Sequence, residues 1–522
     1  MRLIGALLKT LLWVTWIVLV LATPLLGAWL ASSLLSYFGG PRELALIGGV
    51  LLFPLLPLAW EARATRVFKR RVASRNWYGK PPRRSLSAPV RVVLRTLFLN
   101  LLFIAALLFW YPKVAFAALA TRGDWFLGER QDELAQRTRS DLFRVASGLE
   151  WLHRWANPNP YKKDGDSTPV PDDVVPTEQV PPEPMAQQAA QSGSDAAAPV
   201  ETGAPDAGSV PTPAPAPALA EPDDGSGEEQ TRRVGATSWP RPDTVSATVA
   251  AMRARDEGTI EAVARYVAAR ESDPFERVKA LHDWVVTRLR YDHESADGPV
   301  RKPQDAEHVF AARTAVCEGY ARLLVEMGKF TGDRIAYVVG DVREQNGDLA
   351  SSGHAWNAVQ IDGAWYLLDA TWDDPATKDG ADNYRTDYLF IPPNVATLDH
   401  FPDDERWQLL ATPLSRGEFL RQPFARPGHA REGLALLAPE RSSVEVGDAV
   451  ELRLSNPRRL HVLAELVPEH SEQGVECGVD DGAEVRLRCP VPAGGKYEAR
   501  LFTNRTRYGR YGSVAMIEVT RR

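Results

Sequence analysis

Residues 314–374 decide the fold, through TAVCEGYARLLVEM at their start and GHAWNAVQIDGAWYLLDATWDD at their end, from residue 353 to 374. They supply one cysteine, one histidine and one aspartate in that order: Cys317, His354 and Asp369. Acyl transfer by a cysteine needs a thiol nucleophile, a base that removes its proton and a carboxylate that orients the base. The question for the sequence is whether these three side chains meet.

The first motif predicts a helix with one buried face. Thr314 is a plausible N-cap, and apolar residues recur after it at intervals of three and four. Cys317 then lies in the first turn, where unpaired backbone N–H groups and the helix dipole favour a thiolate. Gly319 leaves room for a substrate or another segment to approach. The apolar positions are Tyr320, Leu323, Leu324 and Met327.

The second motif predicts a β-hairpin. HAWNAVQI and AWYLLDATW are strand-like and are joined by Asp362-Gly363, a strong signal for a two-residue turn. Counting outward from that turn puts Trp356 opposite Asp369, so that His354 and Asp369 lie diagonally on one face. Their Cβ atoms are then roughly 7–8 Å apart or less, within reach of an imidazole and a carboxylate. A register slip of one residue would separate them to opposite faces.

A cysteine at a helix start followed by a His/Asp hairpin resembles the transglutaminase-like superfamily, whose fold is related to papain. CEGYARL, GHAWNAV and WYLLDATWDD are similar to motifs of bacterial transglutaminase-like proteins and of the kyphoscoliosis peptidase branch. WVVTRLRYD upstream and YLFIPP downstream extend the resemblance over about residues 255–412.

The resemblance implies that Cys317 is the nucleophile, His354 the general base and then acid, and Asp369 the orienting group. It also implies an oxyanion-stabilising side chain upstream of the nucleophile, for which Trp284 and Tyr291 are both candidates. No cofactor is implied.

Other side chains near these motifs have two interpretations. Trp356 and Trp365 are candidates for lining a substrate groove, but they suit the core of a hairpin equally well. His308 and His400 are expected to be structural. For Asp373–Asp374 we expect a solvated turn rather than a cation site, because two adjacent carboxylates are weak evidence for a metal. No metal site is predicted.

Residues 1–120 are expected to form a membrane region with three transmembrane helices, at about 11–35, 44–60 and 97–120. The segment between the last two is rich in arginine and lysine, which predicts that it stays cytoplasmic and that the rest of the chain is outside. The first run is also compatible with a cleaved signal peptide, and the second, with its two prolines, with a re-entrant segment.

Four further parts follow. Residues 121–156 predict an amphipathic helical stalk, and residues 157–237 a disordered linker rich in proline, alanine and acidic residues. Residues 238–426 should form the α+β, papain-like catalytic domain. Residues 427–522 show short alternating strands, for which an Ig-like β-sandwich is expected.

Composition limits the other possibilities. A net charge of −6 argues against nucleic acid as the main partner, and no phosphate-binding or dinucleotide-binding motif is present. The chain has three cysteines. Cys477 and Cys489 flank a turn signal and would face each other in a hairpin, so we expect a disulfide there if the region is outside the cytoplasm. Cys317 is then the free thiol.

Together these features predict a membrane-anchored cysteine acyltransferase or peptidase acting on protein or peptide amides. Its expected place is a bacterial inner membrane, with the catalytic domain in the periplasm. The alternative is a catalytically inactive, transglutaminase-like scaffold that binds envelope proteins. Thiol reactivity separates the two, because a functional thiolate is alkylated well below pH 8 and an inert buried thiol is not.

Overall fold

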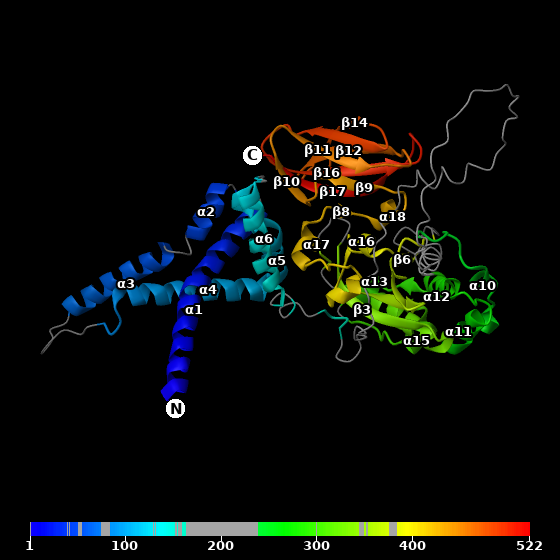
Figure 1. Ribbon diagram of the computed structural model, residues 1–522, viewed down its shortest axis with the longest axis horizontal. Helices are drawn as coiled ribbons and strands as arrows, with labels where there is room; N and C mark the ends of the chain where they lie inside the picture. Colours follow the sequence, from blue (N-terminus) through cyan, green and yellow to red (C-terminus); the bar gives the residue numbers. More distant parts are fainter. Residues whose placement is uncertain are drawn as a thin grey trace, which may run out of the picture.

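We describe the fold from a computed structural model of the chain. Figure 1 shows three parts: long N-terminal helices in blue and cyan, an α+β part in green and yellow, and a β-rich part in orange and red. The described residues are 2–38, 40, 42–50, 55–74, 84–128, 130, 132–151, 154, 159–162, 239–298, 300–343, 349–350, 353–374 and 384–521.

Among these residues, two helical stretches are long and apolar enough to cross a bilayer: Trp13–Tyr37 and Ala88–Trp110. The apolar run expected at 44–60 is divided between two helices, with residues 51–54 outside the described chain. The run expected at 97–120 also differs, because its helix begins at Ala88 and a new one starts at Pro112. The N-terminal helices are α1 (Arg2–Tyr37), α2 (Arg42–Val50), α3 (Leu56–Ala73), α4 (Ala88–Trp110) and α5 (Pro112–Arg122).

Helices α3 and α4 lie antiparallel. Near the start of α3, Trp60 meets Phe98, with ring centroids 6.0 Å apart. Further along α3, Thr65 accepts a hydrogen bond of 3.1 Å from Arg84, which precedes α4. Between these contacts the buried carboxylate of Glu61 pairs with three basic side chains, which satisfies a charge that would otherwise be costly to bury. They are Arg84, Arg91 and Arg95.

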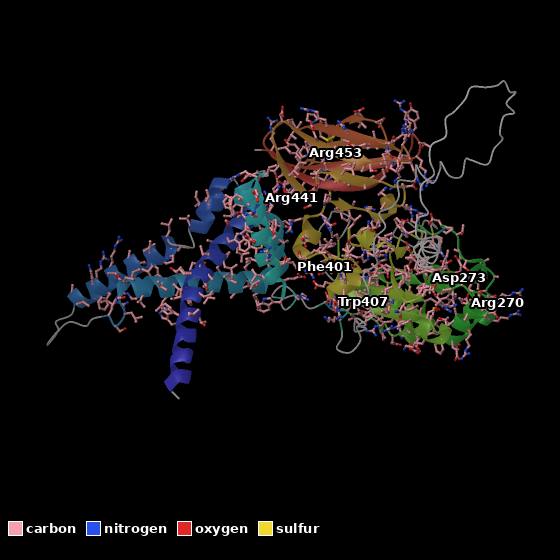
Figure 2. The ribbon with its side chains drawn as sticks, viewed as in Figure 1. Arg270, Asp273, Phe401, Trp407, Arg441 and Arg453 are labelled. Atoms are coloured by element: carbon pink, nitrogen blue, oxygen red, sulfur yellow. A yellow bond between two sulfur atoms is a disulfide. The ribbon has the colours of Figure 1, made fainter. Side chains whose placement is uncertain are left out.

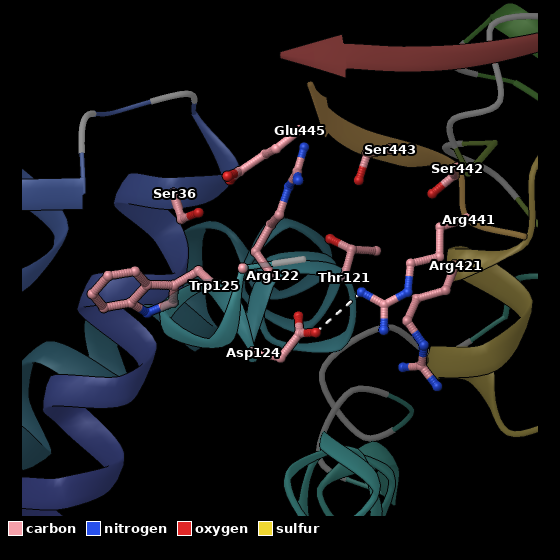
Figure 3. A pocket seen from close by; sticks show the side chains of 11 residues that line it. Ser36, Thr121, Arg122, Asp124, Trp125, Arg421, Arg441, Ser442, Ser443 and Glu445 are labelled. Carbon is pink, nitrogen blue, oxygen red and sulfur yellow. Dashed lines mark hydrogen bonds and ion pairs between the residues drawn. The ribbon is translucent and has the colours of Figure 1, made fainter. Parts of the chain in front are cut away.

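The N-terminal helices attach to the rest of the molecule through α5 and α6 (Glu133–Gly148). A stalk was expected at 121–156, whereas α6 packs against α5 and against α17 (Arg416–Arg421). At the junction, Asp124 accepts bonds from Arg139 (2.6 Å) and Arg441 (3.1 Å). Figure 3 shows the Asp124–Arg441 pair beside a small cavity of about 30 Å³. Figure 2 places Arg441 at the same boundary.

The α+β part contains a five-stranded antiparallel sheet in the order β6-β5-β4-β3-β7. Helix α15 (Cys317–Thr331) packs against β3 and β4, and α11, α12 and α14 pack against α15. The strands are β3 (Arg334–Val342), β4 (His354–Ile361), β5 (Ala364–Leu368), β6 (Leu389–Ile391) and β7 (His400–Pro402). The remaining elements are α10 (Ala247–Ala250), η3 (Ala254–Asp256), α11 (Ile260–Ala268), α12 (Pro274–Arg288), α13 (His293–Asp297), α14 (Ala306–Ala312), α16 (Pro393–Ala396) and η4 (Glu405–Gln408).

The hairpin register is confirmed. Ile361 pairs with Ala364 and Asn357 with Leu368, which continues to the expected position of Asp369. The turn works because Asp362 and Gly363 both take positive φ, 50° and 82°, as a two-residue turn between twisted strands requires.

The expected N-cap at Thr314 is wrong. Thr314–Ala315 forms a short strand, β2, parallel to β1 (Arg290–Tyr291), and Val316 is the N-cap of α15. The backbone of Thr314 is committed to this pairing, so the helix starts at Cys317 itself. By contrast, α12 has a side-chain N-cap: Asp273, labelled in Figure 2, accepts from the backbone of Glu276 at 3.0 Å.

The C-terminal part is built from two sheets around one apolar core. One sheet has the order β10-β17-β16-β12-β13, with β8 also paired to β17, and the other has the order β14-β15-β11-β9. The Ig-like assignment stays a prediction. The elements are β8 (Phe424–Ala425), α18 (Pro427–Ala430), β9 (Ala435–Ala438), β10 (Ser443–Val446), β11 (Ala449–Ser455), β12 (His461–Pro468), β13 (Val475–Glu476), β14 (Gly478–Asp480), β15 (Glu484–Pro490), β16 (Gly495–Asn504) and β17 (Gly512–Arg521).

Two further expectations from the sequence concern the cysteine pair and the linker. A disulfide joins Cys477 to Cys489, as expected. Of the linker expected at 157–237, residues 157–158 and 163–237 lie outside the described residues. Its first part does not behave as a linker, because Tyr161 is only 2% exposed and packs in the α+β part.

Candidate active site

Cys317 is the first residue of α15 and is only 1% exposed. The turn before it is held by Gln304, whose side-chain oxygen accepts from the backbone N–H of Val316 at 3.0 Å. Gly319 is required by this packing: a Cβ there would lie 2.6 Å from both Ala315 and Gln304. Because the first N–H groups of a helix have no intrahelical partner, the backbone at Cys317 can donate to a developing oxyanion.

His354, at the start of β4, and Asp369, just after β5, are joined by a hydrogen bond of 2.7 Å from Nε2 to Oδ2. Cys317 lies close enough to His354 to interact with its ring, and since Nε2 is engaged by Asp369, Nδ1 is the ring nitrogen without that bond. Burial alone would lower the pKa of His354, but Asp369 and Cys317 raise it to about 10. Burial opposes ionisation of Asp369, yet His354 and His400 hold the pKa of this carboxyl well below its usual range.

His400, expected to be a structural residue, lies directly against this pair. Its Nε2 is 3.2 Å from Oδ2 of Asp369, and its Nδ1 is 2.7 Å from Oδ1 of Asp399. Asp399 in turn accepts from the Tyr388 hydroxyl at 2.7 Å. Although burial lowers the pKa of His400, the two carboxylates raise it overall. The strand pairing brings His400 close to His354. Gly340 on β3 pairs with His354 on one side and, on the other, with Pro402 of β7, the strand that begins at His400.

Aromatic rings enclose the two histidines. Trp372 lies 4.6 Å from His400 and 5.3 Å from His354 between ring centroids, and Trp356 lies 5.0 Å from His400. Trp356 therefore borders these histidines, but it is buried in an apolar core cluster, and its role in a groove stays a prediction. Trp365 lies elsewhere, in the core against Trp407, which Figure 2 labels, at 5.0 Å. The wall of rings lowers the local dielectric and strengthens the His–Asp interaction.

The two oxyanion candidates lie in different surroundings. Trp284 is fully buried in the main core, stacked on Phe310 at 5.3 Å, and its indole N–H has no hydrogen-bond partner within the described residues. Tyr291 packs in the cluster that contains Cys317. Burial and the neighbouring Cys317 raise the pKa of Tyr291 well above its usual value, so its hydroxyl stays a donor. The geometry favours Tyr291.

The solvated turn expected at Asp373–Asp374 is wrong, because both carboxylates are buried. Asp373 is 3.1 Å from Nε2 of His282 and accepts from the backbone of Tyr388 at 3.0 Å. Burial raises its pKa to about 6. Asp374 accepts from the Tyr320 hydroxyl at 2.5 Å. These bonds tie the segment after Asp369 to α12 and α15, so they fix where the Asp369 carboxylate points.

Ligand atoms of His354, Asp369 and His400 all lie within 4.8 Å of one another, a spacing that a metal ion could use. In this structure the same atoms are engaged in hydrogen bonds with each other. Their arrangement is therefore complete without a cation.

Part of the chain is similar to known proteins. Residues 261–370 match the model of the transglutaminase-like superfamily. The kyphoscoliosis peptidases of Mus musculus and Homo sapiens are 31% and 30% identical, over 36% and 32% of this chain and 30% and 27% of their own. A LIM and transglutaminase domain protein of Caenorhabditis elegans is 26% identical over 28% of this chain and 23% of its own. A solved structure titled as a TGase is 20% identical, covers 31% of this chain and 41% of its own, and superposes with a TM-score of 0.19.

The chain thus carries a transglutaminase-like domain, and the resemblance to the superfamily and to the kyphoscoliosis peptidase branch is confirmed. The chain spans less than a third of the length of these curated relatives.

Proposed function

We propose that this protein is a membrane-anchored cysteine acyltransferase or peptidase, with Cys317, His354 and Asp369 as its catalytic residues. The observation that carries the proposal is the buried His354–Asp369 hydrogen bond of 2.7 Å beside the buried Cys317, inside a transglutaminase-like domain. Its order matches the needs of nucleophilic catalysis: the carboxylate orients the imidazole, and the imidazole activates the thiol.

The reaction begins when His354 takes the proton of Cys317. The thiolate attacks the carbonyl carbon of a glutamine carboxamide or a peptide bond, and a tetrahedral intermediate forms. The backbone N–H of Cys317 and the Tyr291 hydroxyl stabilise its oxyanion. His354 then gives its proton to the leaving amine, and an acyl-enzyme remains. A lysine amine as acceptor gives a cross-link, whereas water gives deamidation or proteolysis.

Asp369 accepts from Nε2 of His354, which leaves Nδ1 facing the thiol. His400 acts as a positioning residue. As an imidazolium it donates to Asp369 and to Asp399, so the Asp369 carboxylate is held from two sides. His400 does not touch the thiol in this mechanism, and its effect reaches Cys317 through Asp369.

Attachment to a bacterial inner membrane, with the catalytic domain outside the cytoplasm, is part of the proposal. Two apolar helices support it. The C-terminal end of α1 meets the β-rich part, where Tyr37 accepts from Lys496 at 3.3 Å. The C-terminal end of α4 leads into α5, where Lys113 donates to Ala350 at 3.2 Å. Both α1 and α4 thus run toward the folded domains. Between them in the chain, α3 is antiparallel to α4 and runs away from those domains.

The three-span topology stays a prediction, because α3 carries several charged side chains and two described helices are apolar enough to cross a bilayer. The basic C-terminal half of α3 lies at the end of the α3–α4 pair away from the folded domains (Figure 1), which is the cytoplasmic end by the positive-inside rule. The Cys477–Cys489 bridge also suits an oxidising compartment. A reporter that is active only outside the cytoplasm should work when fused after Arg522 and fail when inserted at residue 78.

The catalytic proposal is tested with the full-length protein in detergent. Since Cys477 and Cys489 are bridged, Cys317 is the free thiol among the three cysteines, so iodoacetamide reports on it alone. We expect alkylation at pH 6–7 that is clearly faster in the parent than in His354→Ala and absent from the Cys317→Ser control. Release of ammonia or incorporation of a fluorescent amine into glutamine-bearing proteins then identifies the acceptor. Equal, slow alkylation in the parent and His354→Ala would instead support the scaffold alternative.

A further inference from the structure

Residues Asn159–Lys162 lie across the candidate active site, although they come more than 150 residues before Cys317 in the sequence. Two hydrogen bonds between a side chain and a main-chain carbonyl hold the segment. Asn159 donates to the carbonyl of Gly340 at 2.9 Å. The Tyr337 hydroxyl donates to the carbonyl of Tyr161 at 3.1 Å. Gly340 and Tyr337 belong to β3, the strand beside His354. The segment is therefore fastened to the strand that borders the catalytic histidine.

Tyr161 reaches the nucleophile. It packs in one buried cluster with Cys317, Tyr337 and Ala355, and its hydroxyl is close enough to the Cys317 thiol to interact with it. The guanidinium of Arg301 lies over the ring at 4.6 Å from its centroid, a cation–π arrangement. Burial and the neighbouring Cys317 raise the pKa of Tyr161 well above its usual value, so the hydroxyl stays a donor. A substrate carbonyl approaching the sulfur from this side meets the phenol first.

The surface under the segment is shaped to receive it. Gly353, directly before His354, has a positive φ of 69°, and a Cβ there would lie 2.9–3.0 Å from the side chain of Asn159. At the other end of the segment, Lys162 pairs with Asp403 at 4.0 Å. Main-chain hydrogen bonds, a cation over an aromatic ring and a glycine that makes room are features of a groove that binds a polypeptide.

We propose that Asn159–Lys162 occupies the groove through which a polypeptide substrate reaches Cys317. The groove then recognises a peptide that carries an aromatic side chain, and the chain's own segment blocks the thiol until it is displaced. This inference rests on the proposed cysteine chemistry, because it assigns a ligand to the same site. The attachment is intramolecular, so a substrate must compete with a segment present at high effective concentration.

The alternative is that Tyr161 is a core residue or a catalytic hydrogen-bond donor, and two substitutions separate these roles. In full-length protein in detergent, Tyr161→Ala should speed iodoacetamide alkylation of Cys317 at pH 7 by about tenfold or more. Tyr161→Phe keeps the ring and removes the hydroxyl from the thiol, so it should give a smaller increase. Tyr508→Ala is the matched control, because Tyr508 is 84% exposed in the β-rich part.

A peptide tests the groove itself. In Tyr161→Ala protein, acetylated and amidated Asn-Pro-Tyr-Lys at millimolar concentration should slow alkylation again, whereas Asn-Pro-Ala-Lys should not. Protection by neither peptide, or by both equally, would overturn the recognition of an aromatic side chain. Slower alkylation in Tyr161→Phe would overturn the blocking role and make Tyr161 a catalytic donor. Thermal melting checks that each variant is folded, and Tyr161→Phe serves if Tyr161→Ala is not.

The two proposals fail in different ways. If Tyr161→Ala leaves alkylation unchanged while His354→Ala slows it, the catalytic proposal stands and the blocking segment does not. If Tyr161→Ala speeds alkylation but His354→Ala has no effect in either background, the segment covers a thiol that is not activated.

Discussion

The position of His400 leads to a prediction that separates a positioning role from simple packing. Its Nδ1 lies 2.7 Å from Asp399 and its Nε2 lies 3.2 Å from Asp369. An asparagine amide nitrogen stands as many bonds from Cα as Nδ1, and a glutamine amide nitrogen as many as Nε2. His400→Asn should therefore keep the bond to Asp399 and lose the one to Asp369, and His400→Gln should do the reverse.

The magnitude follows from the lost bond. A hydrogen bond from a charged donor contributes about 1.5–3 kcal/mol. At about 1.4 kcal/mol per factor of ten, its full effect on the orientation of Asp369 and His354 lowers the rate of Cys317 alkylation by roughly 10- to 100-fold in His400→Asn. His400→Gln should stay within about fivefold of the parent. Both variants lose a buried cation between two carboxylates, so both should be destabilised, by roughly 3–5 kcal/mol at most.

The assay is the alkylation rate of Cys317 between pH 6 and 8, with thermal melting of the same samples. Similar melting temperatures with different rates would locate the effect in the bond to Asp369. If His400→Asn and His400→Gln react at the same rate, whether fast or slow, His400 does not act through Asp369 and the reasoning is refuted.

Three further predictions concern stability. Because the pKa of His354 is raised from 6.5 to about 10, its contribution is complete below pH 6.5 and is lost as the pH rises through 10. The depressed pKa of Asp369 works in the opposite sense, since its contribution is lost only in strong acid. The melting temperature of the parent should fall more between pH 7 and 10 than that of His354→Gln, and equal slopes would contradict the ion pair. Gly319→Ala should lower stability, because the crowding of its Cβ costs about 1–3 kcal/mol against a gain of about 1 kcal/mol in helix propensity; unchanged melting would speak against the tight packing there. The Cys477–Cys489 bridge closes a separation of 12 residues, so replacing both cysteines by serine should lower the stability of the β-rich part by about 3 kcal/mol. Two free thiols in non-reducing peptide mapping would show that the bridge does not form.

Local rules carried most of the prediction of the site. The hairpin register follows from a side-chain period of two and from the positive φ that Asp362-Gly363 accepts, so His354 and Asp369 could be assigned to one face by counting. Helix periodicity located Cys317 in a first turn. The N-cap predicted at Thr314 is wrong, because the Thr314 backbone pairs as a strand with Arg290–Tyr291. This pairing partner lies more than 20 residues earlier in the chain.

The remaining site residues depend on contacts between distant segments. His400 reaches Asp369 only because β7 joins the edge of β3, and nothing in the sequence around residue 400 announces that strand order. From the sequence, Asp373 and Asp374 predict an exposed acidic turn. In the fold, His282 of α12 and Tyr320 of α15 lie within hydrogen-bond distance of these two carboxylates.

The sequence by itself determined the hairpin that carries His354 and Asp369 and the cysteine at the start of its helix, because periodicity and turn residues act over a few neighbouring positions. Only the tertiary structure decided that His400 lies against the Asp369 carboxylate and that Tyr161 packs in the same buried cluster as Cys317. Composition predicted a linker from residue 157 onward, since proline, alanine and acidic residues cannot form a core of their own. Tyr161 is an exception, because it is buried in a core formed by residues far along the chain.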